Sequence, residues 1–170
     1  MSRTASLSQA WKKPPDGTYK MNWDASLDTT RGLVGIGAII RDSYGRVLGT
    51  FRARREITLS PYAAEVYALM MAILFCKEAG INEVTLEGDS LQVVKKLKDS
   101  REDWSPGGLI VEDTRAVLRS FAFWNVCHTK RDGNVATHLL AKDALLSEFD
   151  LYDLEEIPNC IKQVVASDAL

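Results

Sequence analysis

Three acidic residues lie where the sequence pattern changes, and together they could bind metal ions. Asp24 lies in the alternating stretch TYKMNWDAS, Glu65 is the only charged residue between residues 63 and 76, and Asp89 follows the apolar residues of VTLEGDS. Carboxylates brought close together repel one another unless cations neutralise them. Their oxygens suit Mg²⁺ or Mn²⁺, which also accept phosphate oxygens as ligands. Two such ions about 4 Å apart can stabilise both oxygens of an in-line displacement at phosphorus, which is phosphodiester cleavage.

Each acidic residue also has a purely structural explanation. Glu65 could be favoured in the first turn of a helix by the helix dipole. Asp89 could be the N-cap of a helix over residues 91–98, and Asp24 could lie in a turn. The expected elements decide between these explanations, because the three residues form one site only if the fold brings them together.

The first part of the chain is expected to form a sheet. Alternating and apolar patterns predict an antiparallel meander of three strands over residues 18–26, 34–40 and 46–54. The first strand is expected to end near Asp24. Gly35 and Gly37 in the second strand indicate either a β-bulge or the close approach of another backbone segment.

The strongest helix pattern covers residues 60–80. Ser60 is expected as the N-cap and Pro61 as the first helical residue, and Gly80 follows the last turn. This helix is apolar on nearly every side, so it should be central and buried. The remaining pattern predicts a strand, two helices, a strand and a helix, over residues 82–90, 91–98, 107–121, 123–129 and 134–149.

This order of elements predicts an α/β fold with a mixed five-stranded sheet covered by helices. If the first and fourth strands are central and the helix over residues 60–80 packs beside them, the three acidic residues converge at one edge of the core. We expect a flexible tail over residues 1–10, one domain over residues 11–149, and a C-terminal extension of that domain over residues 150–170.

Composition limits the classes of function. The chain has 170 residues, of which 46% are hydrophobic and 26% charged, and its net charge is −2. Nucleic acid would therefore have to be bound by local basic groups, which gather only at 52–55 and 95–98, or through metal ions. The longest apolar run, residues 66–76, is too short to cross a bilayer, so no membrane association is expected.

The cysteines and the N-terminal residues indicate the compartment. Cys76, Cys127 and Cys160 are an odd number without the spacing of a zinc site, which indicates reduced thiols. The N-terminal residues contain no apolar segment of a secretory signal. We expect an intracellular monomer, located in the cytoplasm, the nucleus or an organelle.

Five stretches of the sequence form a specific pattern when they are taken together. They are WKKPPDGTYKMNWDAS, GIGAIIRDSYGRVLG, SPYAAEVYAL, VTLEGDSLQVV and HTKRDGNVATHLLAK, and they span roughly residues 11–145. In this order they resemble the ribonuclease H family, specifically its plant reverse-transcriptase-like branch, which is related to retroelements. The resemblance implies a ribonuclease H-like fold in which the fourth and fifth strands run parallel to the first. It also implies two Mg²⁺ ions, with Mn²⁺ as a substitute, and an RNA–DNA hybrid as substrate.

The same resemblance assigns roles to the acidic residues. Asp24, Glu65 and Asp89 take the places of three of the family's four acidic metal ligands. Asp24 would bridge both ions, while Glu65 and Asp89 would hold mainly the ion beside the leaving group. A metal-activated water would then attack the RNA phosphate and leave a 3′-hydroxyl and a 5′-phosphate.

The fourth ligand position departs from the family pattern. The pattern N-x-x-x-D-x-L-A carries an aspartate, whereas His138 takes its place in the segment from Asn134 to Ala141. The resemblance implies that this ligand serves the water-activating ion. A neutral imidazole lowers the formal charge of the site from −4 to −3, which should weaken Mg²⁺ binding and favour softer ions such as Mn²⁺. The alternative is that His138 only packs on a helix face.

Further candidates surround these ligands. The resemblance places His128 in a loop where many members carry a mobile histidine that assists proton transfer and product release. Arg131 could contact a phosphate. Small polar residues next to the carboxylates could contact the 2′-hydroxyls of a hybrid, although each could equally be a cap or turn residue: Ser26, Ser60, Ser90 and Asn134.

The leading interpretation is a metal-dependent endonuclease that cuts the RNA strand of RNA–DNA hybrids. The alternative is a ribonuclease H-like module with weak or no turnover that binds nucleic acid or a protein partner. The imidazole at residue 138, the net negative charge and the acidic stretch 98–108, in place of a basic protrusion, favour the alternative. The three retained carboxylates favour the enzyme.

Overall fold

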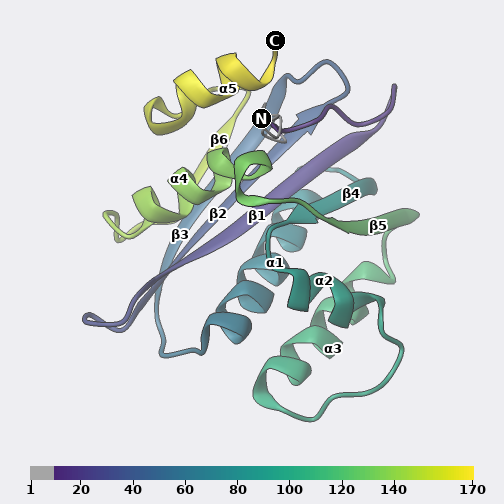
Figure 1. The fold of residues 1–170 in the computed structure, drawn as a ribbon, viewed down its shortest axis with the longest axis vertical. Coiled ribbons are helices and arrows are strands. Elements are labelled where there is room, and N and C mark those ends of the chain that lie inside the picture. Colours follow the sequence, from purple (N-terminus) through teal and green to yellow (C-terminus); the bar gives the residue numbers. More distant parts are fainter. Residues whose placement is uncertain (1–9) are drawn as a thin grey trace, which may run out of the picture.

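In the computed structural model, which describes residues 10–170, a single mixed sheet carries helices on both faces (Figure 1). The tail expected over residues 1–10 lies, except for its last residue, outside the described residues. The sheet has six strands in the order β5-β4-β1-β2-β3-β6. Their bounds are Tyr19–Asp28 (β1), Leu33–Asp42 (β2), Val47–Glu56 (β3), Glu83–Gly88 (β4), Phe123–His128 (β5) and Leu151–Leu154 (β6).

The strand pairing matches the expected topology with one addition. β1, β2 and β3 form the antiparallel meander, and β4 and β5 run parallel to β1. β1 and β4 are neighbours inside the sheet, as the convergence of the acidic residues requires. The expected count of five strands is wrong, because β6 pairs with β3 at the edge. Its four residues, alternately half-buried and exposed, are too few to give a clear pattern.

Five α-helices complete the described fold: Pro61–Glu78 (α1), Leu91–Lys98 (α2), Pro106–Leu118 (α3), Val135–Ala144 (α4) and Lys162–Asp168 (α5). Helix α1 has the expected cap, because the Ser60 hydroxyl accepts the N–H of Ala63. Helix α4 ends five residues before the expected limit at residue 149. Hydrogen bonds from the N–H groups of Leu145 and Leu146 to carbonyls three residues earlier tighten the chain there into turns.

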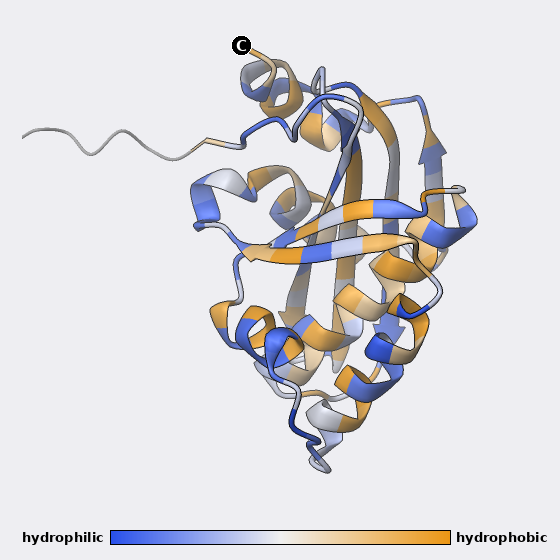
Figure 2. Ribbon diagram, turned by 90° about the vertical axis from the view of Figure 1, so that its right-hand side faces the viewer, coloured by the Kyte–Doolittle hydropathy of each residue, from blue (hydrophilic) through white to orange (hydrophobic). Residues whose placement is uncertain are grey.

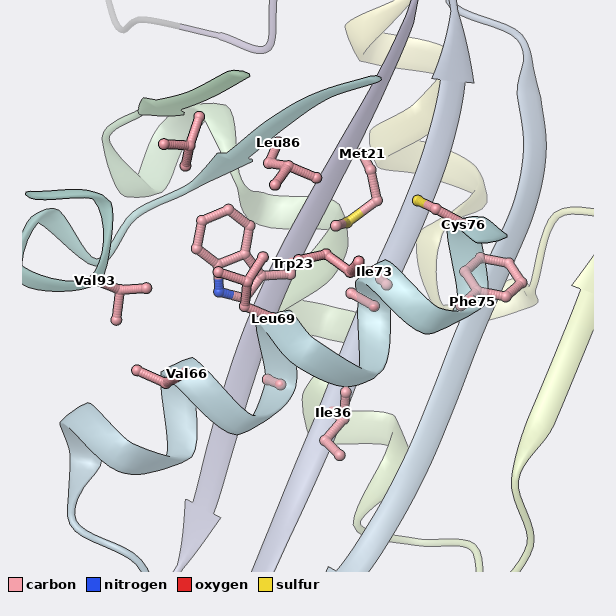
Figure 3. Close-up of a cluster of buried hydrophobic side chains, with 14 of the residues drawn as sticks. Met21, Trp23, Ile36, Val66, Leu69, Ile73, Phe75, Cys76, Leu86 and Val93 are labelled. Atoms are coloured by element: carbon pink, nitrogen blue, oxygen red, sulfur yellow. The ribbon is translucent and has the colours of Figure 1, made fainter. Parts of the chain in front are cut away.

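The helices cover the two faces of the sheet unequally. Helices α1, α2 and α3 pack over Met21 and Trp23 of β1 around the larger core cluster, part of which Figure 3 shows. Helices α4 and α5 cover the opposite face around a smaller cluster that includes Leu140. The central strands are largely apolar where helices flank them (Figure 2). Three polar residues of β1 are nevertheless buried, namely Lys20, Asn22 and Asp24. Buried polar groups need hydrogen-bond partners. Within residues 10–170, no helix is both long and apolar enough to span a bilayer.

Glycines in β2 let α4 approach the sheet closely. A Cβ atom on Gly37 would lie 2.5 Å from the carbonyl oxygen of Thr137 and 2.6 Å from the backbone nitrogen of Ala141. Gly35 meets the carbonyl of Ala141 in the same way. Of the two explanations left open for these glycines, the close approach is confirmed, because β1 and β2 stay in register through both of them.

Replacing Gly37 with Ala should therefore destabilise the protein by about 1–3 kcal/mol, the usual cost of overpacking. The added methyl group would meet backbone atoms of α4, which cannot move without shifting the helix. Urea unfolding measures the effect. Gly49→Ala in β3 is the matched control and should cost less, since its methyl group would first meet side chains of Phe75 and Leu154 at 3.0 and 3.2 Å. Equal stability of Gly37→Ala and wild type would contradict the close packing of α4.

Candidate active site

Asp24 lies inside β1 rather than at its end. The strand continues to Asp28, because Ala25 and Leu27 still pack on the core. Asp24 pairs in register with Gly37 of β2, and its side chain is buried. The expected strand end and the turn explanation for Asp24 are therefore wrong. The residue instead occupies a rigid and nearly solvent-free position.

Glu65 and Asp89 reach Asp24 from two other elements. Glu65 is the fifth residue of α1 and lies beyond its first turn, so the helix dipole does not explain it. Asp89 follows β4, and the N-cap of α2 is Ser90, whose hydroxyl accepts the N–H of Val93. The capping explanation for Asp89 is therefore wrong as well.

The three carboxylates converge as the sequence predicts. One oxygen from each of Asp24, Glu65 and Asp89 lies within 4.8 Å of the other two. Burial raises the pKa of Glu65 to about 10, and the charges of Asp24 and Asp89 act in the same direction. Burial also raises the pKa of Asp24, with Asp89 adding to the effect. In the absence of cations, Glu65 is therefore protonated at neutral pH.

The donor set fits a divalent metal ion. Oε1 of Glu65 accepts the N–H of Ala25 at 3.3 Å, whereas Oε2 is buried and has no hydrogen-bond partner among the described residues. Leaving a buried oxygen unsatisfied costs about 1–3 kcal/mol. A cation beside Oε2 would satisfy this oxygen and neutralise the cluster. Three carboxylates offer only hard oxygen ligands, which suit Mg²⁺ and Mn²⁺.

Replacing Glu65 with Gln should stabilise the metal-free protein increasingly as the pH rises. The folded-state pKa of about 10 lies above the ordinary value of 4.5, so the wild-type protein loses stability as the pH rises from 4.5 towards 10. Gln resembles the protonated acid and does not titrate. One pKa unit corresponds to about 1.4 kcal/mol, so a gain of at least about 1 kcal/mol is expected near pH 8. Urea unfolding in EDTA at several pH values measures it.

The matched control for this prediction is Glu78→Gln, at the exposed end of the same helix. Its effect on the free energy of unfolding should be small, because the side chain is exposed. Mg²⁺ should reverse the order of wild type and Glu65→Gln, because the wild-type carboxylate binds the ion. An advantage of Glu65→Gln that stays constant with pH would show that Glu65 is not buried as a protonated acid.

His138 reaches the cluster through Asp24. It is the fourth residue of α4, and its Nδ1 atom lies 3.1 Å from Oδ2 of Asp24. The ligand atoms of the three carboxylates lie close to one another, and the imidazole contacts this group through Asp24. A carboxylate accepts and does not donate, so Nδ1 carries the proton when Asp24 is ionised. The Nε2 lone pair of a neutral His138 is then free for a proton or a metal ion.

His128 lies at the end of a strand rather than in the expected loop. It is the last residue of β5, opposite Gly88 of β4, and its side chain is exposed. Its Nε2 atom lies 3.2 Å from the backbone carbonyl oxygen of Asp89. The imidazole is therefore next to the acidic cluster and open to solvent.

The other predicted contact residues lie in varied surroundings. Ser60 and Ser90 are helix N-caps, so the cap explanation for them is confirmed, although a hydroxyl that accepts a backbone N–H can still donate its own proton. Ser26 is half-buried on β1, on the same face as Asp24. Arg131 is exposed at the start of a short 3₁₀ helix.

Asn134 requires a correction. It is buried, and its Nδ2 atom donates to the carbonyl oxygen of Trp23 at 3.0 Å. Its Oδ1 atom accepts from Nδ2 of Asn22 at 3.2 Å. The side chain therefore joins α4 to β1 and does not face the solvent as a groove contact would. Asn22, its partner, was not among the predicted site residues. Its signal is the spacing of Lys20, Asn22 and Asp24, which places three polar residues on one covered face of a central strand.

The arginines of β3 do not form a free basic patch. Arg52 bridges Asp143 and Asp153 at 2.7 and 2.9 Å, and Arg55 pairs with Asp150 at 2.6 Å. The pairs with Asp150 and Asp153 hold the C-terminal extension against the sheet, and the pair with Asp143 links β3 to α4. The basic group at 52–55, one of two considered for nucleic acid binding, is thus neutralised within the chain.

Comparison with known proteins agrees with this geometry. The family model described as reverse transcriptase-like matches residues 22–144, well over half of the chain. An Arabidopsis thaliana protein named "Putative ribonuclease H protein" is 25% identical over 160 residues. The match covers 94% of this chain, which spans only about a quarter of that relative's length.

Solved structures show the same fold. RNase H1 from Halobacterium salinarum superposes with a TM-score of 0.69 at 23% identity, covering 76% of this chain and 98% of that one. LC11-RNase H1, solved in complex with an RNA/DNA hybrid, gives 0.67 at 20% identity, covering 76% and 100%. The N-terminal RNase H domain of a Mycobacterium tuberculosis protein gives 0.67 at 21% identity, covering 75% and 93%. The chain therefore belongs to the reverse transcriptase-like family and forms a ribonuclease H-like domain.

Proposed function

We propose that the protein is a metal-dependent endonuclease that hydrolyses the RNA strand of RNA–DNA hybrids. The observation that carries the proposal is the convergence of three carboxylates in a ribonuclease H-like fold, where Oε2 of Glu65 is buried without a hydrogen-bond partner among residues 10–170. The hybrid bound to LC11-RNase H1, which has the same fold, supports the substrate class.

Asp24 is the central group of the proposed site. It interacts with Glu65 on one side and with His138 on the other, which suits a ligand shared by two ions. Glu65 and Asp89 would complete the ligand set. Two Mg²⁺ or Mn²⁺ ions, when bound, supply charge stabilisation at the phosphate and a water of lowered pKa.

The two histidines would handle protons and metal at two places in the cluster, His138 beside Asp24 and His128 beside Asp89. His138, held by Asp24 through Nδ1, presents Nε2 as an additional ligand or a proton acceptor. His128 is exposed, and within the described part of the chain its one hydrogen bond is to a backbone carbonyl, so it can turn toward a leaving oxygen and donate a proton.

Substrate recognition would depend on shape and hydroxyl contacts. A hybrid near A-form displays 2′-hydroxyls in a wide, shallow minor groove. The hydroxyls of Ser26, Ser60 and Ser90 belong to the elements that carry the three carboxylates or adjoin them, and Arg131 is available for a phosphate. Because the β3 arginines are already paired, we expect modest affinity without sequence preference.

The second candidate is a binding module with little turnover. Its support is the contact between His138 and Asp24, which engages one oxygen of the central carboxylate with an imidazole instead of adding a fourth acid. Such a module would still bind hybrids through the same surface or bind a protein partner.

Cleavage of a labelled RNA–DNA hybrid, first with Mg²⁺ and then with Mn²⁺, separates the two candidates. The enzyme proposal expects cleavage that Asp89→Asn removes, together with stronger activity in Mn²⁺. Hybrid binding without cleavage in either metal would support the binding module. Cleavage that survives in Asp89→Asn would come from a contaminating nuclease.

A further inference from the structure

Trp11 begins a chain of buried hydrogen bonds that ends at the candidate site. It lies before β1, is 5% exposed, and donates through Nε1 to Oδ1 of Asn22 at 3.0 Å. Asn22 is fully buried on β1, two residues before Asp24 and on the same face. Nδ2 of Asn22 donates to Oε1 of Glu87 at 3.0 Å and to Oδ1 of Asn134 at 3.2 Å.

The Trp11 indole is compatible with only one orientation of both amide groups. An indole N–H can only donate, so Asn22 must turn its oxygen toward Trp11 and its NH₂ group toward Asn134. Asn134 must then present its oxygen to Asn22 and its NH₂ group to the carbonyl oxygen of Trp23, 3.0 Å away. Glu87 and the carbonyl of Trp23 require the same directions, because both can only accept, and Trp11 satisfies the amide oxygen at the start of the series.

This series of bonds acts on both partners of the contact between His138 and Asp24. Trp23, which receives the last bond, directly precedes Asp24. Asn134 directly precedes α4, and its backbone carbonyl accepts the N–H of His138 at 3.1 Å. A change at Asn22 or Asn134 therefore shifts the two residues relative to each other.

Trp11 is itself held by the C-terminal helix. The Arg41 guanidinium lies 3.8 Å from the centre of the Trp11 ring and pairs with Asp168 of α5 at 2.9 Å. Arg41 is buried, so this pair is shielded from solvent. Trp11 and Asp168 both lie outside the residues matched by the family model, 22–144. The flanking segments of this chain thus contact the site region through Trp11.

We propose that Trp11 is a positioning residue, which acts through Asn22 and Asn134 to hold His138 against Asp24. The expected effect on kinetics rests on the proposed nuclease function. The expected effect on structure rests on hydrogen bonding alone. Residues that orient metal ligands typically change activity about 10–100-fold when they are mutated. Trp11→Phe keeps an aromatic ring on Arg41 but removes the one donor to Oδ1 of Asn22 that residues 10–170 provide.

The structural test uses the two histidines of the chain. In Trp11→Phe, the ring resonances of His138 in NMR spectra at one fixed pH should shift, whereas those of His128 should not. Trp104→Phe, at a position that is 77% exposed, is the matched control and should move neither. Unchanged His138 resonances in Trp11→Phe, or equal shifts of both histidines, would overturn the proposal.

The kinetic test separates positioning from substrate binding. Trp11→Phe should lower kcat for hybrid cleavage about 10–100-fold and leave KM within about threefold, because no contact with the hybrid is lost. A rise in KM at unchanged kcat would overturn the proposal. If wild-type protein cleaves nothing, the nuclease function fails, and the NMR comparison still decides the role of Trp11.

A second variant makes the test possible if Trp11→Phe does not fold. Benzothienylalanine at residue 11 has nearly the shape of tryptophan but carries sulfur in place of the N–H group. It preserves the stacking on Arg41, so the fold should survive, and it should reproduce the His138 shift. Wild-type His138 resonances in this folded variant would also overturn the proposal.

Discussion

Asp24→Asn should lower hybrid cleavage more than about 100-fold in Mg²⁺ and in Mn²⁺, because changes behind metal ligands already cost about 10–100-fold. The substitution keeps the size of the side chain and removes the charge that lies between Glu65 and His138. Without it, the remaining carboxylates cannot hold two ions together. Cleavage assays under single-turnover conditions measure the chemical step directly.

Mn²⁺ binding distinguishes loss of the site from loss of fold in this variant. Calorimetric titration should show at least one Mn²⁺ site missing or greatly weakened in Asp24→Asn. The metal-free variant should be at least as stable as wild type, because a buried charge has been removed from the cluster. Asp113→Asn, exposed on α3, is the matched control and should behave like wild type. Wild-type Mn²⁺ affinity in Asp24→Asn would contradict the ligand assignment.

His138→Asp should raise activity in Mg²⁺ relative to Mn²⁺ by about tenfold or more. It replaces the imidazole beside Asp24 with a carboxylate and restores four acidic groups. A unit charge 4 Å from a divalent ion is worth about 2 kcal/mol even at the dielectric constant of water, or roughly 30-fold in affinity. The gain should favour Mg²⁺, because Mn²⁺ loses a nitrogen ligand that it accepts more readily. The measurement is the ratio of rates at equal and sub-saturating concentrations of Mg²⁺ and Mn²⁺.

His138→Asn is the matched control for this effect. Asn has the size of Asp without its charge, so it should not raise activity in Mg²⁺. The metal-free His138→Asp protein should also unfold at lower urea concentration than wild type, since a further carboxylate then faces Asp24. If His138→Asp leaves the metal ratio unchanged, His138 takes no part in metal preference and only packs against β1.

The acidic cluster could be predicted from the sequence because each member breaks its local pattern. Glu65 is the lone charge in an apolar helix, and Asp89 follows a buried strand just before a helix. These local exceptions, combined with the order of the elements, place the three carboxylates at one point. The exact position of Asp24 was not predictable in the same way. Apolar residues on the other face continue the strand past it to Asp28.

The supporting contacts could not be predicted because they depend on tertiary packing. Asn22 and Asn134 are 112 residues apart, and each resembles an ordinary strand or cap residue on its own. Their burial follows from the close approach of α4 to Gly37, which the glycine only suggests. The pairing of the β3 arginines likewise depends on acidic residues about 90–100 positions later in the chain. Strand β6 is too short to give a clear pattern of its own.

The central claim is that Asp24, Glu65 and Asp89, together with His138, form a metal site that cuts the RNA strand of hybrids. Its most direct test is strand-specific product analysis of a hybrid labelled on either strand, incubated with wild-type protein in Mn²⁺ and with Asp89→Asn in parallel. We expect cuts in the RNA strand alone, each leaving a 5′-phosphate and a 3′-hydroxyl, and none with Asp89→Asn. An intact RNA strand with the hybrid bound, or cuts that persist in Asp89→Asn, would contradict the claim.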